Sequence, residues 1–307
     1  MRLITRPDLD GLTCGVLLDV VEDIDEVVFV EPQDMQKGRV DVRSEDIVAN
    51  LPYDPRCALW FDHHISNRLP EGTTFRGAFH IDPSAARTVY NYYRDPRLDR
   101  YRELLEATDR VDAALLSLDD VLHPQGYVLL SLSLDPRSNF ENSDAYYHQL
   151  LEWLKVEPID AILKHEVVAE RCTRILDEQR SFEALLRRHS RIDGEVVVVD
   201  LRGIDPLPVG SRFLVYALFP DCSASVKVYP ARNAPGHVGI SLGHSIFKRV
   251  QKVNVGYLCA RYGGGGHFGA ASCSVPAGRA DQVVEEVIAV LKRNEAIDSQ
   301  KRPYVHT

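Results

Sequence analysis

Short apolar runs alternate with amphipathic stretches through the first half of the chain. Arg2–Thr5, Glu26–Val30 and Cys57–Phe61 are largely apolar and are followed by polar residues. Such runs are typical of parallel strands that are buried on both faces. Gly11–Asp23 carries apolar residues at helical spacing, and Pro83–Tyr93 is a second helical stretch. The alternation predicts an α/β fold with a doubly wound, mainly parallel sheet.

The second half begins with a long charged stretch of helical character, interrupted only by Pro158. A second α/β pattern follows it. Its strand candidates are Glu195–Leu201, Phe213–Phe219, Ala224–Tyr229 and Val238–Leu242, and its helix candidates are Val255–Tyr262 and Ala280–Lys292. We therefore expect a first domain over residues 1–143, a helical connector over 144–190 and a smaller α/β domain over 191–307.

Composition narrows the class of protein. The 307 residues are 45% hydrophobic and 26% charged, as in a globular protein with a proper core. Against 36 Lys and Arg stand 45 Asp and Glu, giving a net charge of −9, which argues against a broadly basic surface that coats nucleic acid. Binding of a phosphorylated substrate would then depend on local cations or metal ions.

Cysteine spacing and hydropathy indicate the compartment. The six cysteines lie far apart, without the paired spacing of a zinc site. No run approaches the roughly 18 apolar residues of a membrane span, and the first five residues already turn polar, unlike a signal peptide. We expect a cytoplasmic protein with reduced thiols and no membrane partner.

Carboxylates and imidazoles gather where the predicted strands end. Asp8 and Asp10 follow the first strand, and Asp62, His63 and His64 follow the third apolar run. Open α/β sheets bind ligands at the carboxyl ends of their strands, so we expect these groups to share one edge. Carboxylate with imidazole suits Mn²⁺, Zn²⁺ or Fe²⁺ better than Ca²⁺. For the first pair the alternative is a helix cap at Asp10 beside a solvated Asp8.

A later acidic pair, Asp109 and Asp112, is three residues apart. If the segment is helical, both side chains share one face of the helix and could join the same site. A solvated helix edge that includes Arg110 is the alternative.

Four consecutive glycines, Gly263–Gly266, precede His267. Glycines permit positive φ and let backbone N–H groups close around an anion, so the segment is a candidate phosphate site. A flexible glycine loop is the alternative. No Gly-Lys-Ser/Thr follows, which distinguishes the segment from a nucleotide-binding P-loop.

In their order along the chain, these motifs resemble the DHH–DHHA1 phosphoesterase superfamily. That superfamily includes RecJ exonucleases, oligoribonuclease/phosphoadenosine-phosphate phosphatases and exopolyphosphatases. The resemblance covers about residues 1–295, and its specific parts are Asp62-His63-His64 and Gly263–Ala271. It implies a DHH domain with two divalent ions, usually Mn²⁺ with Mg²⁺ or Co²⁺ as substitutes, and a smaller DHHA1 domain that holds the substrate.

The resemblance also implies roles for the residues of the first domain. Asp8 would ligate one ion and Asp10 the other, His63 would be a metal ligand, and His64 would lie beside the scissile phosphate. Asp62, His63 and His64 form the implied catalytic set.

Two further assignments follow from the resemblance. The family's later metal-binding aspartate falls at Asp109 or Asp112, and we prefer Asp109 as the first acidic residue after the helical stretch Arg102–Glu106. The implied substrate-binding residues are Gly264, Gly265, Gly266, His267, His244 and Arg249.

Three positions depart from the family pattern. Ile4 stands where a His is frequent, and Asn50 stands where an Asp usually bridges the two ions. An amide is a neutral ligand, so it cannot offset the mutual repulsion of two ions as a carboxylate would. Gly243 stands where relatives often carry an Arg, although His244 and Arg249 are near in sequence.

The implied function is a Mn²⁺-dependent phosphoesterase that uses a metal-activated water. Its substrates would be small: short single-stranded oligonucleotides, nucleotide phosphates or polyphosphate. The alternative is a protein that binds a phosphorylated ligand or nucleic acid without efficient turnover, because Ile4 and Asn50 replace usual ligands. A processive exonuclease on long DNA fits poorly with the charge of −9. Self-association as a homodimer stays open.

Overall fold

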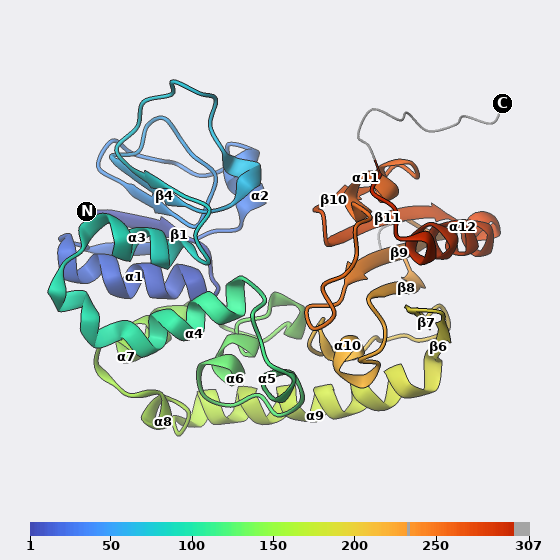
Figure 1. Cartoon of the computed structure of the whole chain (residues 1–307). Coiled ribbons are helices and arrows are strands. Elements are labelled where there is room, and N and C mark those ends of the chain that lie inside the picture. Colours follow the sequence, from blue (N-terminus) through green and yellow to red (C-terminus); the bar gives the residue numbers. More distant parts are fainter. Residues whose placement is uncertain (232–233, 298–307) are drawn as a thin grey trace. The chain divides into compact units, whose positions relative to one another are not determined.

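Two β-sheets organise the chain, each in its own unit (Figure 1). The computed structural model describes residues 1–231 and 234–297, so the last ten residues of the predicted second domain lie outside the described part. Residues 1–116 and 124–175 form the first unit, and residues 117–123 join the second unit with the chain from Leu176 onward. The division falls inside the longest helix, α9 (Glu166–His189).

The first sheet has five strands, all parallel, in the order β2-β1-β3-β4-β5. The strands are β1 Arg2–Thr5, β2 Glu26–Phe29, β3 Ile47–Ala49, β4 Leu59–Asp62 and β5 Gly77–Phe79. Every residue of β3 and β4 is buried, which explains why such strands read as apolar runs. The predicted parallel α/β architecture is confirmed.

Helices cover one face of this sheet and mostly irregular segments cover the other. These helices are α1 Leu9–Val21, α3 Ala85–Tyr93, α4 Arg102–Asp112, α6 Gly126–Leu132, α7 Ser143–Val156 and α8 Ile159–Ile162. The short helix α2 Pro32–Gln36 instead places Met35 against the core of the opposite face. In Figure 1, α1, α3, α4 and α7 lie on one side of β1 and β4, and their core includes Leu3 and Phe61. On the opposite face Trp60 stacks on Phe79, with ring centroids 5.5 Å apart.

The second sheet has six strands in the order β10-β11-β9-β8-β7-β6, parallel only between β7 and β8. Its strands are β6 Ser190–Asp193, β7 Val196–Asp200, β8 Ala224–Pro230, β9 His237–His244, β10 Gly265–Gly266 and β11 Ala270–Pro276. The helices of this unit, apart from α9, are α5 Leu118–Leu122, α10 Leu214–Leu218, α11 Val255–Ala260 and α12 Ala280–Arg293. Leu258 of α11 and Val287 of α12 share a core with Val226 of β8.

Short 3₁₀ turns complete the described elements. They cover Ile65–Asn67, Pro96–Tyr101, Pro136–Ser138 and Ala277–Arg279. No described helix combines the length and the apolar character needed to cross a membrane.

Two predictions about local structure were wrong. Phe213–Phe219 is not a strand: its centre forms α10, whose residues 214–216 are buried. A seven-residue apolar run has no periodicity that separates a buried strand from a buried helical turn. The stretch after residue 143 is not interrupted at Pro158 alone. It forms α7, α8 and α9, and the strand β6 follows directly after α9. The predicted domain boundaries themselves stay a prediction.

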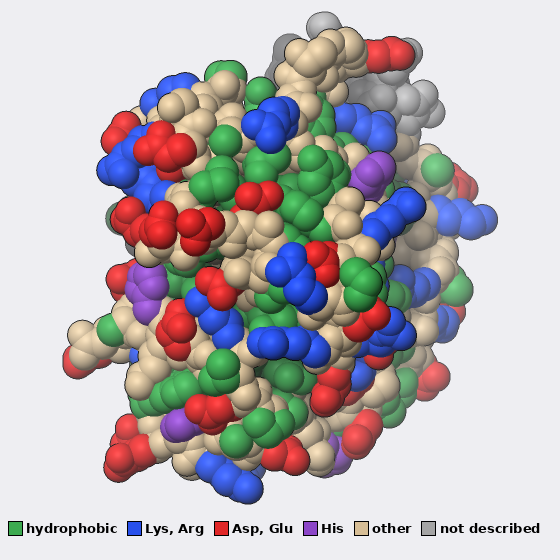
Figure 2. All heavy atoms as spheres, turned by 90° about the vertical axis from the view of Figure 1, so that its left-hand side faces the viewer, with side chains coloured by type: hydrophobic (Ala, Val, Ile, Leu, Met, Phe, Trp, Pro, Cys, Tyr) green, Lys and Arg blue, Asp and Glu red, His purple; other side chains and the backbone are tan. Residues whose placement is uncertain are grey.

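The face of the molecule drawn in Figure 2 carries charged side chains of both signs. On the face drawn in Figure 2, Lys and Arg side chains are interspersed with Asp and Glu. This face therefore has no extended field of a single sign that would attract or repel nucleic acid.

Replacement of Gly77 by alanine should destabilise the first unit. Gly77 has φ of +114°, and a Cβ there would lie 2.0 Å from the carbonyl oxygen of Trp60. We expect Gly77→Ala to lower the free energy of unfolding by about 2–4 kcal/mol, from backbone strain plus steric overlap. Gly72→Ala is the matched control, because Gly72 also has a positive φ but its Cβ would meet nothing within 4 Å.

The control should cost only about 1 kcal/mol. Both tryptophans, Trp60 and Trp153, belong to the first unit, so tryptophan fluorescence during urea unfolding reports on it. Equal unfolding midpoints for the two variants would contradict the prediction.

Candidate metal centre

Asp10 is held between α1 and the start of α3. Its Oδ2 accepts a hydrogen bond from the Ala85 amide (2.9 Å), and its Oδ1 accepts one from the Ala86 amide (2.8 Å). These are the first two residues of α3, so the free N–H groups of a helix start fix the carboxylate. Asp10 is 2% exposed, and this burial, followed by the nearby Asp112 carboxylate, raises its pKa well above the usual value. Its ionised form therefore needs a nearby positive charge.

His63 follows β4 and presents one ring nitrogen to two carboxylates. Its Nδ1 lies 3.0 Å from the Asp82 carbonyl oxygen, which can only accept, so Nδ1 carries the proton. Nε2 lies 3.1 Å from Asp112 Oδ2 and 3.7 Å from Asp10 Oδ2. Burial alone would lower the pKa of His63, but the hydrogen bond to Asp112 and the charge of Asp10 raise it to about 9.

The residues present fit a divalent cation. Asp10, His63 and Asp112 each offer one ligand atom, and these atoms all lie within 4.8 Å of one another. Two carboxylate oxygens and an imidazole nitrogen are a donor set for Mn²⁺, Fe²⁺ or Zn²⁺. Asn50 directly follows β3 and donates to Asp8, and its Oδ1 atom is buried without a hydrogen bond to any described residue.

The two acidic residues of α4 have different partners. Asp109 accepts a hydrogen bond from Ser84 Oγ on Oδ1 (2.6 Å) and from Arg87 Nε on Oδ2 (2.8 Å). Asp112, one helical turn later, faces His63. The geometry therefore brings Asp112, and not Asp109, to His63. Which of the two aspartates binds a metal ion stays a prediction.

Asp62 and His64 form a hydrogen-bonded pair beside this cluster. Asp62 is fully buried, and its Oδ1 lies 2.8 Å from His64 Nδ1. Its Oδ2 accepts a hydrogen bond from Asn67 Nδ2 (2.7 Å). Asp62, His63 and His64 also offer ligand atoms within 4.8 Å of one another. Because Asp62 fixes the ring through Nδ1, Nε2 of the half-buried His64 is the nitrogen left for other contacts.

Asp8, not Asp10, caps α1. Its Oδ1 accepts hydrogen bonds from the Gly11 amide (2.9 Å) and from Asn50 Nδ2 (2.9 Å). Its Oδ2 lies 3.2 Å from Arg6 Nε. The alternative of a cap at Asp10 beside a solvated Asp8 is wrong in this detail. The structure places Asp8 and Asn50 together, and Asp10 with His63 and Asp112.

The glycine segment of the second unit is more regular than a loop. Gly265–Gly266 forms β10 and pairs with β11. A Cβ on Gly264 would lie 2.1 Å from the Ser272 carbonyl oxygen, so close backbone packing requires glycine there. The amides of Gly264 and His267 already donate to backbone carbonyls (3.0 and 2.8 Å). The exposed His267 side chain is the group left to contact an anion.

His244 and Arg249 lie in the same unit as these glycines. His244 ends β9, its Nε2 is buried without a hydrogen bond to any described residue, and burial lowers its pKa. Its ring meets Phe268 edge-on, with centroids 5.2 Å apart. Arg249 Nε donates to the Ile246 carbonyl oxygen (2.9 Å).

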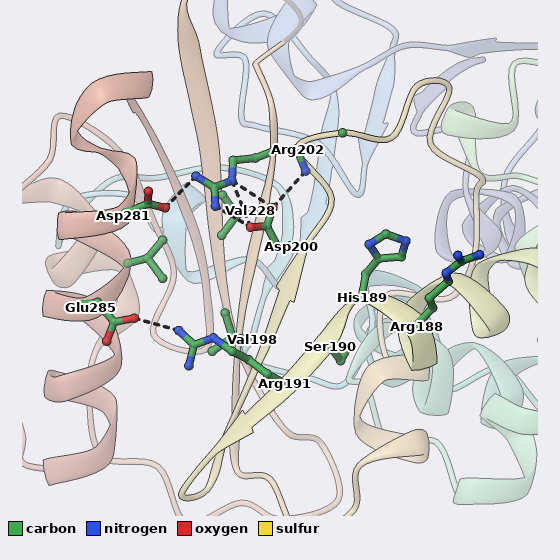
Figure 3. Close-up of a pocket in the computed structure, with 12 residues that line it drawn as sticks. Arg188, His189, Ser190, Arg191, Val198, Asp200, Arg202, Val228, Asp281 and Glu285 are labelled. Atoms are coloured by element: carbon green, nitrogen blue, oxygen red, sulfur yellow. Dashed lines mark hydrogen bonds and ion pairs between the residues drawn. The ribbon is translucent and has the colours of Figure 1, made fainter.

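A groove of about 730 Å³ in the second unit runs beside β7 and α12 (Figure 3). Arg202 pairs there with Asp281 (2.7 Å) and with Asp200, and Arg191 pairs with Glu285 (2.8 Å). The carboxylates offset these arginines, and none of the site residues predicted from the sequence lines the groove. We assign it no part in the phosphoesterase site.

Comparisons with known proteins identify the family. Neither the protein-family models nor the curated proteins give a match. Among solved structures, the chain is similar to a pGpG-specific phosphodiesterase from Vibrio cholerae, with a TM-score of 0.85 and 33% sequence identity. The match covers 96% of this chain and 99% of the other. The chain belongs to the DHH phosphoesterase family.

Two more distant structures share the fold of this DHH protein. An exopolyphosphatase-related protein from Bacteroides fragilis has a TM-score of 0.51 at 13% identity, over 95% of this chain and 91% of that one. RecJ from Thermus thermophilus, in complex with Mn²⁺, has a TM-score of 0.56 at 13% identity, over 96% of this chain and 52% of that one. The family resemblance and the fold class predicted from the sequence are confirmed.

Sequence reasoning gave no role to two residues that shape the site. Arg6 belongs to the first acidic motif and contacts Asp8. Asp82 orients His63 through its backbone carbonyl. Asp82-Pro83-Ser84 immediately before α3 is a helix-start signal, so the sequence predicts that Asp82 lies at the start of this helix. The contact of its backbone carbonyl with His63 is not predictable from the sequence.

Substitution of the two α4 aspartates should separate their roles. We expect Asp112→Asn to weaken Mn²⁺ binding by at least about 10- to 100-fold, since even loss of an outer-shell partner costs that much. Asp109→Asn should leave Mn²⁺ affinity within a fewfold and instead lower the unfolding midpoint, because Arg87 loses its carboxylate partner. Isothermal titration of the metal-free variants with Mn²⁺ measures the two affinities, and urea unfolding measures the two midpoints. Equal losses of Mn²⁺ affinity in the two variants would refute the assignment.

Proposed function

We propose that this DHH protein is a metal-dependent phosphodiesterase that cleaves very short oligonucleotides, with pGpG as the first candidate substrate. The observation that carries the proposal is the convergence of Asp10, His63 and Asp112 within 4.8 Å of one another, beside the Asp62–His64 pair. The 33% identity over nearly the full length with a protein described as pGpG-specific supports this choice of substrate. RecJ in complex with Mn²⁺ shares the fold, which supports Mn²⁺ as the ion.

Asp10, His63 and Asp112 would hold the cation, Mn²⁺ by preference, with Mg²⁺ or Co²⁺ as substitutes. Such a cation lowers the pKa of a bound water and offsets negative charge on phosphoryl oxygens. The chain contributes fixed geometry. The two amides at the start of α3 hold Asp10, and the Asp82 carbonyl holds the His63 tautomer with Nε2 facing the carboxylates.

The remaining residues would act on the phosphate and on the rest of the substrate. Hydrolysis joins a water oxygen to phosphorus and breaks the bond to the 3′ oxygen, so pGpG and water yield two GMP. His64, oriented by Asp62, would contact the scissile phosphate through Nε2. The proposed substrate-binding residues are Gly264, Gly265, Gly266, His267, His244 and Arg249.

One observation favours a second candidate function. Asn50 donates a hydrogen bond to Asp8, where a two-ion site would need ligands. A protein that binds pGpG or another phosphorylated ligand without efficient turnover is therefore the alternative. All six cysteines are free thiols, which supports action in a reducing compartment such as the cytoplasm.

A substrate panel tests the proposal. We expect pGpG to be cleaved to GMP faster than pApA, a ten-nucleotide single strand or polyphosphate when Mn²⁺ is present, and no cleavage in EDTA. His63→Ala should reduce kcat/KM by at least about 10- to 100-fold through loss of a ligand.

His237→Ala is the control, because His237 is an exposed histidine that starts β9 and is assigned no role. Tight binding of pGpG without any GMP formation would favour the binding protein over the enzyme. Unchanged cleavage by His63→Ala would refute the assigned site.

A further inference from the structure

Asp8 stands where a second cation would need a ligand, but its carboxylate oxygens already have partners. Oδ1 accepts from the Gly11 amide and from Asn50 Nδ2, both at 2.9 Å. Oδ2 faces Arg6 Nε at 3.2 Å. A cation on Oδ1 would have to displace a hydrogen-bond donor such as Asn50 Nδ2. A cation on Oδ2 would lie next to the Arg6 guanidinium. Both effects oppose binding of an ion there.

The Asn50 side chain cannot bridge two cations in this arrangement, because its NH₂ group faces Asp8. Facing a carboxylate, an amide must present its NH₂ group, which donates hydrogen bonds and cannot bind a cation. The remaining Oδ1 atom is buried without a hydrogen bond to any described residue. Asn50 is 1% exposed, and its backbone N–H donates to the Phe61 carbonyl oxygen (3.0 Å), so the position of the residue is fixed.

Arg6 places a permanent positive charge at the same point. Its Nε atom lies 3.2 Å from Asp8 Oδ2 and 4.0 Å from Glu31 Oε2, and its side chain is 37% exposed. Its two terminal NH₂ groups form no hydrogen bond with described residues. A guanidinium stays charged at all physiological pH values, and its planar pair of donors matches a phosphate.

We propose that each chain binds one divalent cation, at Asp10, His63 and Asp112, and that Arg6 supplies the second positive charge that contacts the substrate phosphate. The chain thus departs from the two ions that its family resemblance implies. This inference rests on the proposed function, since it concerns the same site.

The number of bound ions is the first test. Metal-free full-length protein is titrated with Mn²⁺ by calorimetry, and the bound Mn²⁺ is read by electron paramagnetic resonance. One ion per chain with the spectrum of an isolated Mn²⁺ is expected. Two ions per chain with a spin-coupled spectrum would overturn the proposal.

Restoring a two-ion site is the second test. The double variant Asn50→Asp, Arg6→Ala exchanges the amide for a carboxylate and removes the competing charge, so it should bind a second Mn²⁺. A folded double variant, verified by circular dichroism, that still binds one ion would show that Arg6 and Asn50 do not exclude the second cation. If the variant does not fold, the ion count of the parent protein still decides.

Phosphate binding by Arg6 is the third test. The probe is a hydrolysis-resistant phosphorothioate analogue of pGpG, titrated in the presence of Mn²⁺. Arg6→Gln should weaken its binding by about 10- to 100-fold, as expected for a charged hydrogen bond, without changing the number of Mn²⁺ ions. Arg6→Lys should recover part of the loss.

Arg39→Gln is the matched control. Arg39 is an exposed arginine of the same unit whose Nη1 lies 3.3 Å from Asp34, so it has a similar ion pair at another place. Equal affinities of Arg6→Gln and Arg39→Gln for the analogue would overturn the role of Arg6.

The outcomes separate this inference from the proposed function. One Mn²⁺ per chain and an Arg6-dependent affinity, without cleavage of any phosphodiester, would refute the enzyme and keep the inference. Cleavage of pGpG by a protein with two Mn²⁺ ions would keep the enzyme and refute the inference.

Discussion

This site depends on the electrostatic cost of holding several carboxylates close together and partly or fully buried. Asp10 and Asp62 are buried, Asp112 approaches His63, and Asp8 lies in the same turn as Asp10. Burial is the first cause of the raised pKa values of Asp8 and Asp10, and the negative charge of Asp112 raises them further. The arrangement is stable only where positive charge or hydrogen-bond donors compensate each carboxylate.

The chain compensates each carboxylate in a different way. Helix N-termini do so at Asp8 and Asp10, where amides of α1 and α3 donate to the oxygens. Arg87 does so at Asp109, through a hydrogen bond that joins α3 to α4. What remains is the space between Asp10, His63 and Asp112, where a protonated imidazole or a divalent cation is needed. The parallel sheet makes this convergence possible, because β1 and β4 end at one edge and deliver Asp10 and His63 together.

The parallel strands and the positions of Asp8, Asp10 and His63 at their ends were predictable from the sequence, because short local patterns indicate them. Strands buried on both faces read as apolar runs, and the residues after them lie at the strand ends by geometry alone. The different surroundings of Asp109 and Asp112 were not predictable, because the partners of Asp109 come from α3 and from the residue that caps it. The helix at residues 214–218 was missed because a short apolar run has no usable periodicity. The role of Arg6 was hidden for a similar reason: only the folded turn shows that it contacts Asp8.

We propose that Asp10, His63 and Asp112 form the cation site of this DHH protein. The most direct measurement is anomalous X-ray diffraction at the manganese edge from crystals of the protein soaked in Mn²⁺. We expect an anomalous peak within bonding distance of a carboxylate oxygen of Asp10, Nε2 of His63 and a carboxylate oxygen of Asp112. A peak on Asp8 or Asp109 that does not touch His63, or no peak at saturating Mn²⁺, would contradict it.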